Sequence, residues 1–300
     1  MDKKEFIIKL NLEVALFLFL TNACLLFAHD KYSSIRVWGT DLEKIQIIQE
    51  IGIPLDHSTF KPGAYIEFIV AEKEKEILLN RGIDFDIIID NLTKYYQEQN
   101  IPAIERDFPL GSMQGNYTWL ELNERFDQLR NLYPDIISDR LIIGESLEGH
   151  DIWAFKLSDN PDQDENEPQV LYTGLTHARE PLSMMNLFYF IQNICENYVA
   201  GNDSEATYLV NERELWFIPV VNPDGYIYNE LIAPDGGGMH RKNRRDTGCG
   251  SGTEQGVDIN RNYGFNWGAN DTGSSPDPCY ATFRGEEPFS EPETRAVRDF

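Results

Sequence analysis

The sequence predicts an α/β fold in which helices flank both faces of a mixed sheet, preceded by a small ferredoxin-like α+β unit. In the C-terminal part, apolar runs of strand length alternate with amphipathic helical segments, which is the pattern of a sheet covered by helices. In the N-terminal part, shorter segments follow the order β-α-β-β-α-β. A polar stretch with several Pro and Gly residues separates the two parts. We therefore divide the chain into the segments 1–28, 29–100, 101–115 and 116–300.

The first segment has the character of a secretory signal peptide. Lys3, Lys4 and Lys9 precede an apolar run at 14–28 that closes on alanine. This run is short for a membrane span, although an uncleaved anchor stays an alternative, and Cys24 weakly suggests a lipoprotein cleavage site. No other stretch of the sequence is apolar enough to cross a membrane. We expect a secreted protein, either extracellular or periplasmic.

The second segment is built from short, regular elements. Asp41 caps a helix that a glycine ends, and the alternation at 65–70 is that of a half-buried strand. The expected elements are a strand at 35–38, a helix at 41–51, a strand near 57–58, a strand at 65–70, a helix at 72–81 and a strand at 85–89. Nothing in this unit indicates catalysis, and His57 beside Asp56 is interpreted as an exposed turn residue. The polar stretch 91–115 is interpreted as a linker, in which Lys94 and Arg106 offer protease sites.

Charge and cysteine content narrow the choice of partners and compartment. The net charge of −24 argues against a nucleic-acid partner, because nothing would offset the repulsion between the chain and phosphate. The acidic loop 159–167 could bind Ca²⁺, but a solvated loop is the preferred interpretation. Cys249 and Cys279 lie in loop sequence and could form a disulfide in an oxidising compartment, whereas Cys195 is expected to be buried on a helix.

The C-terminal segment begins with a helix whose capping box is Thr118 to Glu121, and Pro134 closes that helix. Two strands then form a hairpin around the turn at Gly149. The expected elements that follow are strands at 141–143, 152–157, 170–173 and 215–221, helices from 182 and at 203–212, a turn at 222–225 and a last helix capped at 290–293. The remaining stretch, 229–289, is a long loop, and loops of that length are usually functional.

His177 and Glu180 lie where a predicted buried strand ends and a helix begins, with Pro181 in the first turn of that helix. An imidazole and a carboxylate three residues apart can converge on one Zn²⁺ ion. By itself the pair is weak evidence. The chain has five histidines, and 50 of its 300 residues are acidic, so roughly one histidine is followed by an acidic residue three positions later by chance.

The long loop adds concentrated cations to this acidic chain: Arg241, Arg244, Arg245 and Arg261, the last of them between two asparagines. A charged surface loop is the ordinary interpretation of such a cluster. A zinc peptidase, however, needs a fixed arginine for the oxyanion that forms when water attacks a peptide carbonyl. An exopeptidase also needs a planar clamp, such as Asn with Arg, for a terminal carboxylate.

Four motifs then stand together in one order: His177-x-x-Glu180, Asn222-Pro-Asp-Gly225, Arg241-Lys-x-Arg244 and Gly256-Val-Asp-x-Asn-Arg-Asn262. In order and spacing they resemble the funnelin-type zinc metallocarboxypeptidases, the carboxypeptidase A or peptidase M14 family. Each motif alone is weak, whereas four in sequence are specific. The resemblance covers about 117–300, and the preceding unit resembles the activation segment of the same family. The fold it implies is phosphorylase/hydrolase-like.

The resemblance implies a role for each matching residue. His177 and Glu180 correspond to two ligands of one zinc ion, and Arg244 to the catalytic oxyanion donor. Asn260 and Arg261 correspond to the residues that bind the terminal carboxylate, and Arg179 to a contact with the substrate backbone. Cys249 and Cys279 match a disulfide that some members contain.

The remaining parts of the family's site follow the position at which this sequence stops, Phe300. They are the third zinc ligand, the catalytic Glu, the substrate-contacting Tyr and the specificity pocket. His240 flanks the arginine motif and is not expected to bind metal, so we assign no general base. We expect an incomplete chain of an active enzyme, and the preferred C-terminal residue stays open.

The predicted function is zinc-dependent hydrolysis of C-terminal residues of peptides and proteins by metal-activated water. The expected form is a secreted, monomeric zymogen with a signal peptide (1–28), an activation pro-domain (29–100), a linker (101–115) that an activating protease cuts, and the N-terminal part of the enzyme domain (116–300). Two alternatives stay open. One is a secreted, non-catalytic binder of peptide C-termini, and the other is a zinc amidase that acts on cell-wall peptides.

Overall fold

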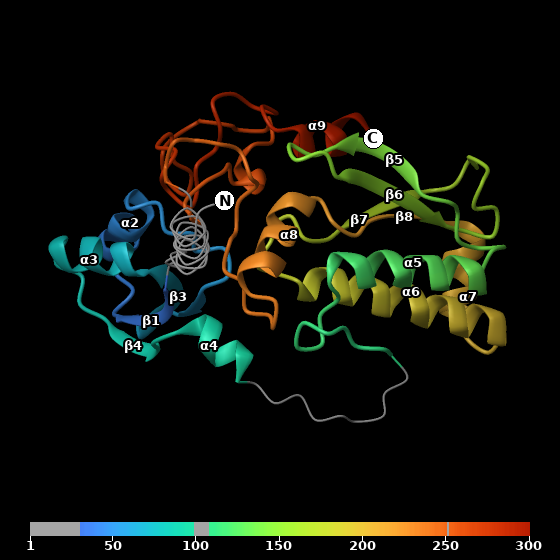
Figure 1. The fold of residues 1–300 in the computed structure, drawn as a ribbon, viewed down its shortest axis with the longest axis horizontal. Coiled ribbons are helices and arrows are strands. Elements are labelled where there is room, and N and C mark those ends of the chain that lie inside the picture. Colours follow the sequence, from blue (N-terminus) through green and yellow to red (C-terminus); the bar gives the residue numbers. More distant parts are fainter. Residues whose placement is uncertain (1–30, 99–107, 251) are drawn as a thin grey trace, which may run out of the picture. The chain divides into compact units, whose positions relative to one another are not determined.

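The computed structural model describes residues 31–98, 108–250 and 252–300. The predicted signal peptide and residues 101–107 of the predicted linker lie outside the described residues. The described chain forms two four-stranded sheets with helices packed on them (Figure 1). No helix within these ranges combines the length and apolar character that a bilayer span requires.

The N-terminal sheet has the strand order β2-β3-β1-β4, and every pair in it is antiparallel. Its elements are β1 (Tyr32–Trp38), α2 (Leu42–Glu50), β2 (Thr59–Lys61), β3 (Tyr65–Ala71), α3 (Glu72–Asn80) and β4 (Asp86–Ile89). This is the β-α-β-β-α-β order expected from the sequence. Asp41 caps α2 by accepting a hydrogen bond from the Lys44 amide, as predicted. Alternate residues of β3 are buried, and Phe68 packs in one core with Ile48 and Leu78 of the two helices.

The polar stretch that was interpreted as a linker is partly helical. Residues Leu92–Gln97 form α4, and the side chain of Asn91 accepts a hydrogen bond from the Lys94 amide at its start. Thr93 donates to the carbonyl of Gly237 at 3.0 Å, so α4 also contacts the long loop. The linker interpretation is therefore wrong for this helix, because a capping asparagine and a docking contact compensate for its polar sequence.

The C-terminal sheet has the order β5-β6-β8-β7. Its strands are β5 (Leu141–Glu145), β6 (Asp151–Leu157), β7 (Gln169–Thr173) and β8 (Glu214–Ile218). Strands β7 and β8 are parallel and the other pairs are antiparallel, which confirms the predicted mixed sheet. The hairpin of β5 and β6 around Gly149 is also as predicted.

Helices cover both faces of this sheet (Figure 1). They are α5 (Trp119–Leu132), α6 (Leu182–Ala200) and α7 (Ser204–Glu212) on one face and α9 (Pro292–Asp299) on the other. Side chains of β6 alternate between the faces: Phe155 packs against α5 and α6, whereas Ala154 packs in one cluster with Ala296 of α9. Lys156 is buried with Glu214 as an ion pair of 2.7 Å.

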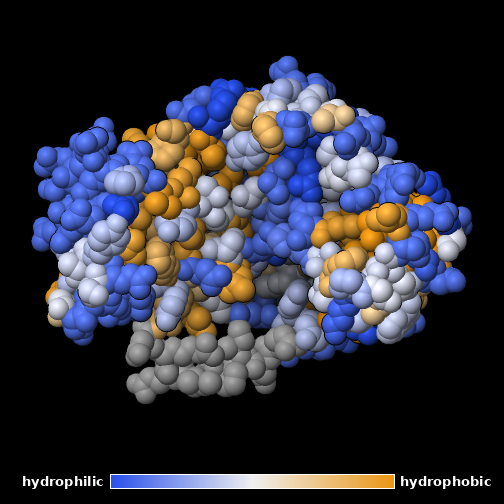
Figure 2. Space-filling model, turned by 180° about the vertical axis from the view of Figure 1, so that it is seen from behind, coloured by the Kyte–Doolittle hydropathy of each residue, from blue (hydrophilic) through white to orange (hydrophobic). Residues whose placement is uncertain are grey.

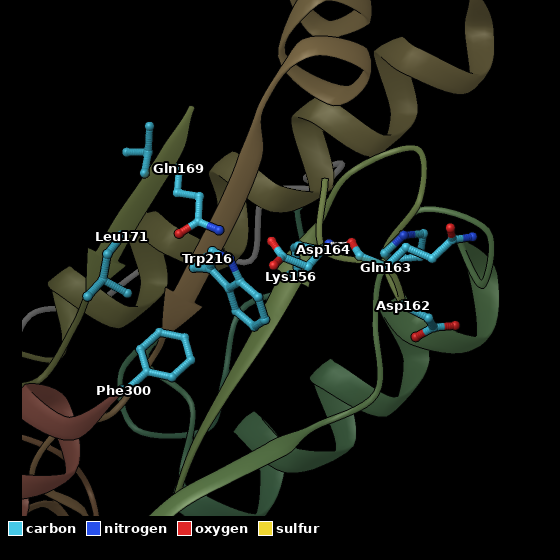
Figure 3. A pocket seen from close by; sticks show the side chains of 10 residues that line it. Lys156, Asp162, Gln163, Asp164, Gln169, Leu171, Trp216 and Phe300 are labelled. Carbon is cyan, nitrogen blue, oxygen red and sulfur yellow. Dashed lines mark hydrogen bonds between the residues drawn. The ribbon is translucent and has the colours of Figure 1, made fainter. Parts of the chain in front are cut away.

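Strand β7 was predicted to be buried, and it is mostly exposed. It forms an edge of the sheet within the described residues, and Leu171 is 44% exposed. Leu171, Trp216 and Phe300 line a pocket of about 500 Å³ together with the acidic loop that follows β6 (Figure 3). An apolar run does not reveal whether its strand is central or at an edge, which is why the prediction failed. Elsewhere, hydrophilic side chains cover much of the face seen in Figure 2, with apolar side chains exposed between them.

Two further boundaries differ from the predictions. The expected turn at 222–225 is the start of a helix, α8 (Pro223–Ile232), which Asn222 caps by accepting from the Gly225 amide. At the start of α9 the Glu291 side chain makes no capping bond. It accepts hydrogen bonds from Asn243 and Arg245 of the long loop instead.

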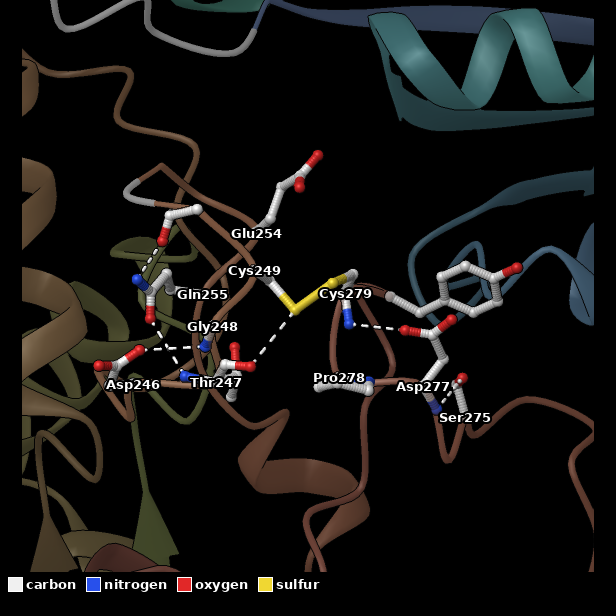
Figure 4. Close-up of a disulfide and its surroundings, with 12 residues drawn as sticks. Asp246, Thr247, Gly248, Cys249, Glu254, Gln255, Ser275, Asp277, Pro278 and Cys279 are labelled. Carbon is white, nitrogen blue, oxygen red and sulfur yellow. Dashed lines mark hydrogen bonds between the residues drawn. A yellow bond between two sulfur atoms is a disulfide. The ribbon is translucent and has the colours of Figure 1, made fainter.

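Among its described residues, the long loop contains one short 3₁₀ turn, η1 (Ile259–Arg261). Cys249 and Cys279 form a disulfide within it, and the Cys279 amide donates to the Asp277 carboxylate at 2.9 Å (Figure 4). Cys195 is a free thiol, fully buried on α6.

Candidate metal and carboxylate site

The turn between β7 and α6 is fixed by one hydroxyl group. Ser183 accepts a hydrogen bond from the Leu175 amide at 2.9 Å and donates to the Glu180 carbonyl at 2.8 Å. The Glu180 amide in turn donates to the His177 carbonyl at 3.1 Å. The turn therefore holds His177 and Glu180 in a set relation to each other.

The two side chains converge as the sequence spacing suggests. His177 Nδ1 lies 3.0 Å from Glu180 Oε2 and 3.1 Å from Oε1. Two donors on one tetrahedral zinc ion, each about 2.0–2.1 Å from the metal, are about 3.3 Å apart. The observed separation therefore fits two ligands of one ion with only a small adjustment.

Behind His177 stands Asp258, whose carboxylate is fully buried and lies 3.2 Å from His177 Nε2. Since a carboxylate only accepts, Asp258 favours a proton on Nε2, and a metal on the other side would replace the proton that Nδ1 shares with Glu180. A carboxylate in the position of Asp258 is the usual support for a histidine ligand. Burial opposes the charge on His177, but its hydrogen bonds to Asp258 and Glu180 outweigh burial and raise the pKa of the imidazole. Burial would also raise the pKa of Asp258, but Arg241 and His177 hold it far below its ordinary value.

Arg241 links this pair to the N-terminal sheet. Its Nε and Nη2 atoms donate to Asp258 Oδ2 at 3.1 and 3.0 Å, and Nη2 also donates to Asp56 Oδ2 at 2.7 Å. The third nitrogen, Nη1, has no hydrogen-bond partner and lies 3.6 Å from Glu180 Oε1. Arg241 is only 3% exposed, so its charge is directed into the site.

Asp56 and His57 reach the same place from the turn before β2. Asp56 Oδ1 accepts from Arg261 Nη2 at 2.7 Å, and His57 Nε2 lies 3.1 Å from Glu180 Oε1. His57 does lie in a turn and its side chain is 60% exposed, as predicted for a turn residue. Its contact with Glu180 was not predicted, and no local signal in the sequence points to it.

Asn260 and Arg261 lie on η1, directly after Asp258. Asp258 caps η1 by accepting from the Asn260 amide at 3.0 Å, so one carboxylate orders this turn and supports His177. Gly256 leads into the turn with φ of 102°, and a Cβ there would lie 2.0 Å from the Asn243 carbonyl oxygen. Only glycine fits this position. The close approach places the segment 256–262 beside the arginine motif at 241–244.

Arg244 and Arg179 lie in other surroundings. The Arg244 guanidinium stacks 3.7 Å from the Tyr228 ring centre and lies 3.7 Å from Glu148. Its Nε and Nη1 atoms are buried without hydrogen-bond partners. Arg179 lies 5.9 Å from the Tyr32 ring centre. Burial, together with Arg241, lowers the pKa of Arg179.

Comparison with known proteins defines the class. Residues 122–300 match the sequence model of the zinc carboxypeptidases, and this is more than half of the chain. The chain therefore belongs to the zinc carboxypeptidase family. It is 39% identical over 164 residues to a zinc carboxypeptidase of Saccharothrix mutabilis subsp. capreolus, covering 54% of this chain and 35% of that protein.

A second relative extends over both sheets. The chain is 26% identical over 287 residues to human mast cell carboxypeptidase A, covering 90% of this chain and 64% of that protein. Among solved structures, the carboxypeptidase A from Helicoverpa armigera has a similar fold, with a TM-score of 0.70 at 24% identity, covering 91% of this chain and 66% of that one. The chain thus spans between about a third and two thirds of the length of these relatives.

Proposed function

We propose that this chain is the precursor form of a zinc carboxypeptidase, which removes C-terminal residues from peptides and proteins. One observation carries the proposal. The donor pair His177 and Glu180 is joined through Arg241 to Asp56, whose carboxylate is bound by Arg261. A metal-donor pair and an arginine that already holds a carboxylate therefore lie within one chain of contacts.

The roles of the residues follow from this arrangement. His177 and Glu180 would hold one zinc ion, which when bound activates water and polarises the scissile carbonyl. Arg261, with Asn260, would bind the terminal carboxylate of a peptide in place of Asp56. Arg244 has buried donors without partners, and these are available to a developing oxyanion. Arg179 would contact the substrate backbone.

The position of Asp56 supports the proposed precursor state. While the segment 29–100 is attached, this carboxylate occupies the arginine that a substrate would need. An activating protease that cuts the linker, at Lys94 or Arg106, would release the segment and free Arg261. Lys94 lies in helix α4, so cleavage there would need local unfolding, because proteases bind extended backbone. The protein would be a secreted monomer, with residues 1–28 as the signal peptide.

The test compares two peptides that differ only at the C-terminus, a free carboxylate and an amide. A form of the protein extended past Phe300, which would include the third zinc ligand and the catalytic Glu that the family resemblance implies, is cut by trypsin in the presence of zinc. It should shorten the free peptide by one residue and leave the amide intact, as read by mass spectrometry. The matched control Glu180→Gln should shorten neither peptide. Cleavage of both peptides would refute an exopeptidase. Binding of the free peptide without cleavage would instead support a non-catalytic binder of C-termini.

A further inference from the structure

We propose that His57 is a ligand of the same zinc ion as His177 and Glu180, so that the N-terminal sheet closes the metal site with one of its own side chains. The inference rests on the proposed zinc site, and adds to it a third donor from the other end of the chain.

The first argument is distance. His57 Nε2 lies 3.1 Å from Glu180 Oε1, and His177 Nδ1 lies 3.0 Å from Glu180 Oε2. Both separations approach the edge of a zinc tetrahedron, about 3.3 Å. His57 and His177 also belong, with Asp56, to a group of residues whose ligand atoms all lie within 4.8 Å of one another.

The second argument is ring orientation. The two imidazole rings are nearly perpendicular, at 87°, and their centres are 6.1 Å apart. Two imidazoles on one tetrahedral ion have ring centres roughly 5 Å apart. The His57 side chain is 60% exposed, so a rotation of the imidazole can close this difference.

The third argument identifies which donor remains available. Asp56 also lies within ligand distance, but its two oxygens accept from Arg241 and Arg261, each at 2.7 Å. A carboxylate bound to two guanidinium groups is a poor metal ligand, because the cations repel the ion. Among the described residues His57 has one ion-pair contact, to Glu180, and a shared metal ion would replace the proton between these two groups.

His57 on the metal would be a second obstacle to substrate, in addition to Asp56 on Arg261. A catalytic zinc ion keeps one coordination position open for water, whereas a structural one is closed by protein ligands. A histidine from the turn before β2 takes up such a position. The adjacent residues Asp56 and His57 would thus shield the carboxylate-binding arginines and the metal, respectively.

The experiment measures metal binding by the full chain without proteolysis. Zinc affinity is determined by competition with a chromogenic chelator for wild type, His57→Ala and the control Gln46→Ala, which removes an exposed side chain of α2 that lies outside both clusters able to hold a metal ion. We expect at least a tenfold loss for His57→Ala and no change for Gln46→Ala. Cobalt substitution should show a visible spectrum that differs between wild type and His57→Ala, because one nitrogen ligand is lost.

A second measurement needs no variant. Diethyl pyrocarbonate modification of the wild-type chain, mapped by mass spectrometry, should spare His57 when zinc is present and modify it when zinc is absent. Equal modification in both states, or unchanged zinc affinity in His57→Ala, overturns the inference. If zinc affinity falls in His177→Ala but not in His57→Ala, the inference about His57 is refuted and the proposed zinc site stands. Zinc affinity unaffected by either substitution refutes that site as well.

Discussion

Replacing Asp258 by asparagine tests the central interaction of the site. Asp258 is fully buried and accepts from Arg241 Nε and Nη2, from the Asn260 amide and from His177. Asparagine has nearly the same shape but no charge, and its amide group would face donors. Removing one partner of a buried ion pair costs about 3–5 kcal/mol. Because Arg241 would keep Asp56, we expect the lower end, about 3 kcal/mol.

The matched control is Asp56→Asn, which removes a carboxylate from the same arginine. Asp56 has a side chain that is 21% exposed, so water can replace part of its interaction. We expect a cost of about 1 kcal/mol, within the range of surface ion pairs. Urea unfolding at pH 7, followed by tryptophan fluorescence and circular dichroism, measures both free energies. If Asp258→Asn costs less than about 1 kcal/mol, or no more than Asp56→Asn, the reasoning about the buried pair is refuted.

Three further predictions concern stability. Burial raises the pKa of Glu293 from 4.5 to about 7, so the folded chain binds a proton at this carboxyl more tightly than the unfolded chain does. The free energy of unfolding should therefore fall by roughly 3 kcal/mol as pH rises from about 4.5 to 7. Glu293→Gln should flatten this profile in urea titrations, and a parallel profile would contradict the assignment. Replacing Cys249 and Cys279 by serine should cost about 2–4 kcal/mol, measured by thermal unfolding. If reductant leaves the melting temperature of the wild type unchanged, the disulfide has no such role. Chelation should remove about 2.7 kcal/mol of unfolding free energy from wild type loaded with zinc at 100-fold excess over Kd. The melting temperature of the wild type should fall accordingly, and that of His177→Ala should not change.

Local signals explain which parts of the fold were predictable. The caps at Asp41 and Thr118 and the alternation along 65–70 depend only on neighbours in sequence, and the structure forms the elements they predict. The exposure of Leu171 depends on which strand lies at the edge of the sheet, and no residue of β7 encodes that. Helix α4 depends on a docking contact with Gly237, which is equally invisible in its own sequence.

The candidate site divides in the same way. His177 and Glu180 are three residues apart on one turn, so their convergence follows from chain geometry. The contact of His177 with Asp258 spans 81 residues, and that of Asp56 with Arg261 spans 205. Such contacts are set by how whole elements pack, so the sequence could suggest Arg261 as a carboxylate binder but not that Asp56 already occupies it.

The charges of the site suggest why a substrate carboxylate could replace Asp56 at Arg261. His177, Asp258, Arg241, Asp56 and Arg261 form a row in which acid and base alternate. If activation removed the N-terminal segment, Arg241 would keep Asp258. Among the described residues, Asp56 is the one ion-pair partner of Arg261, so Arg261 would lose its counter-charge. In a chain of net charge −24, an unpaired guanidinium beside the proposed zinc site would be a specific place for an anion, and the terminal carboxylate of a peptide would take the place of the Asp56 carboxylate.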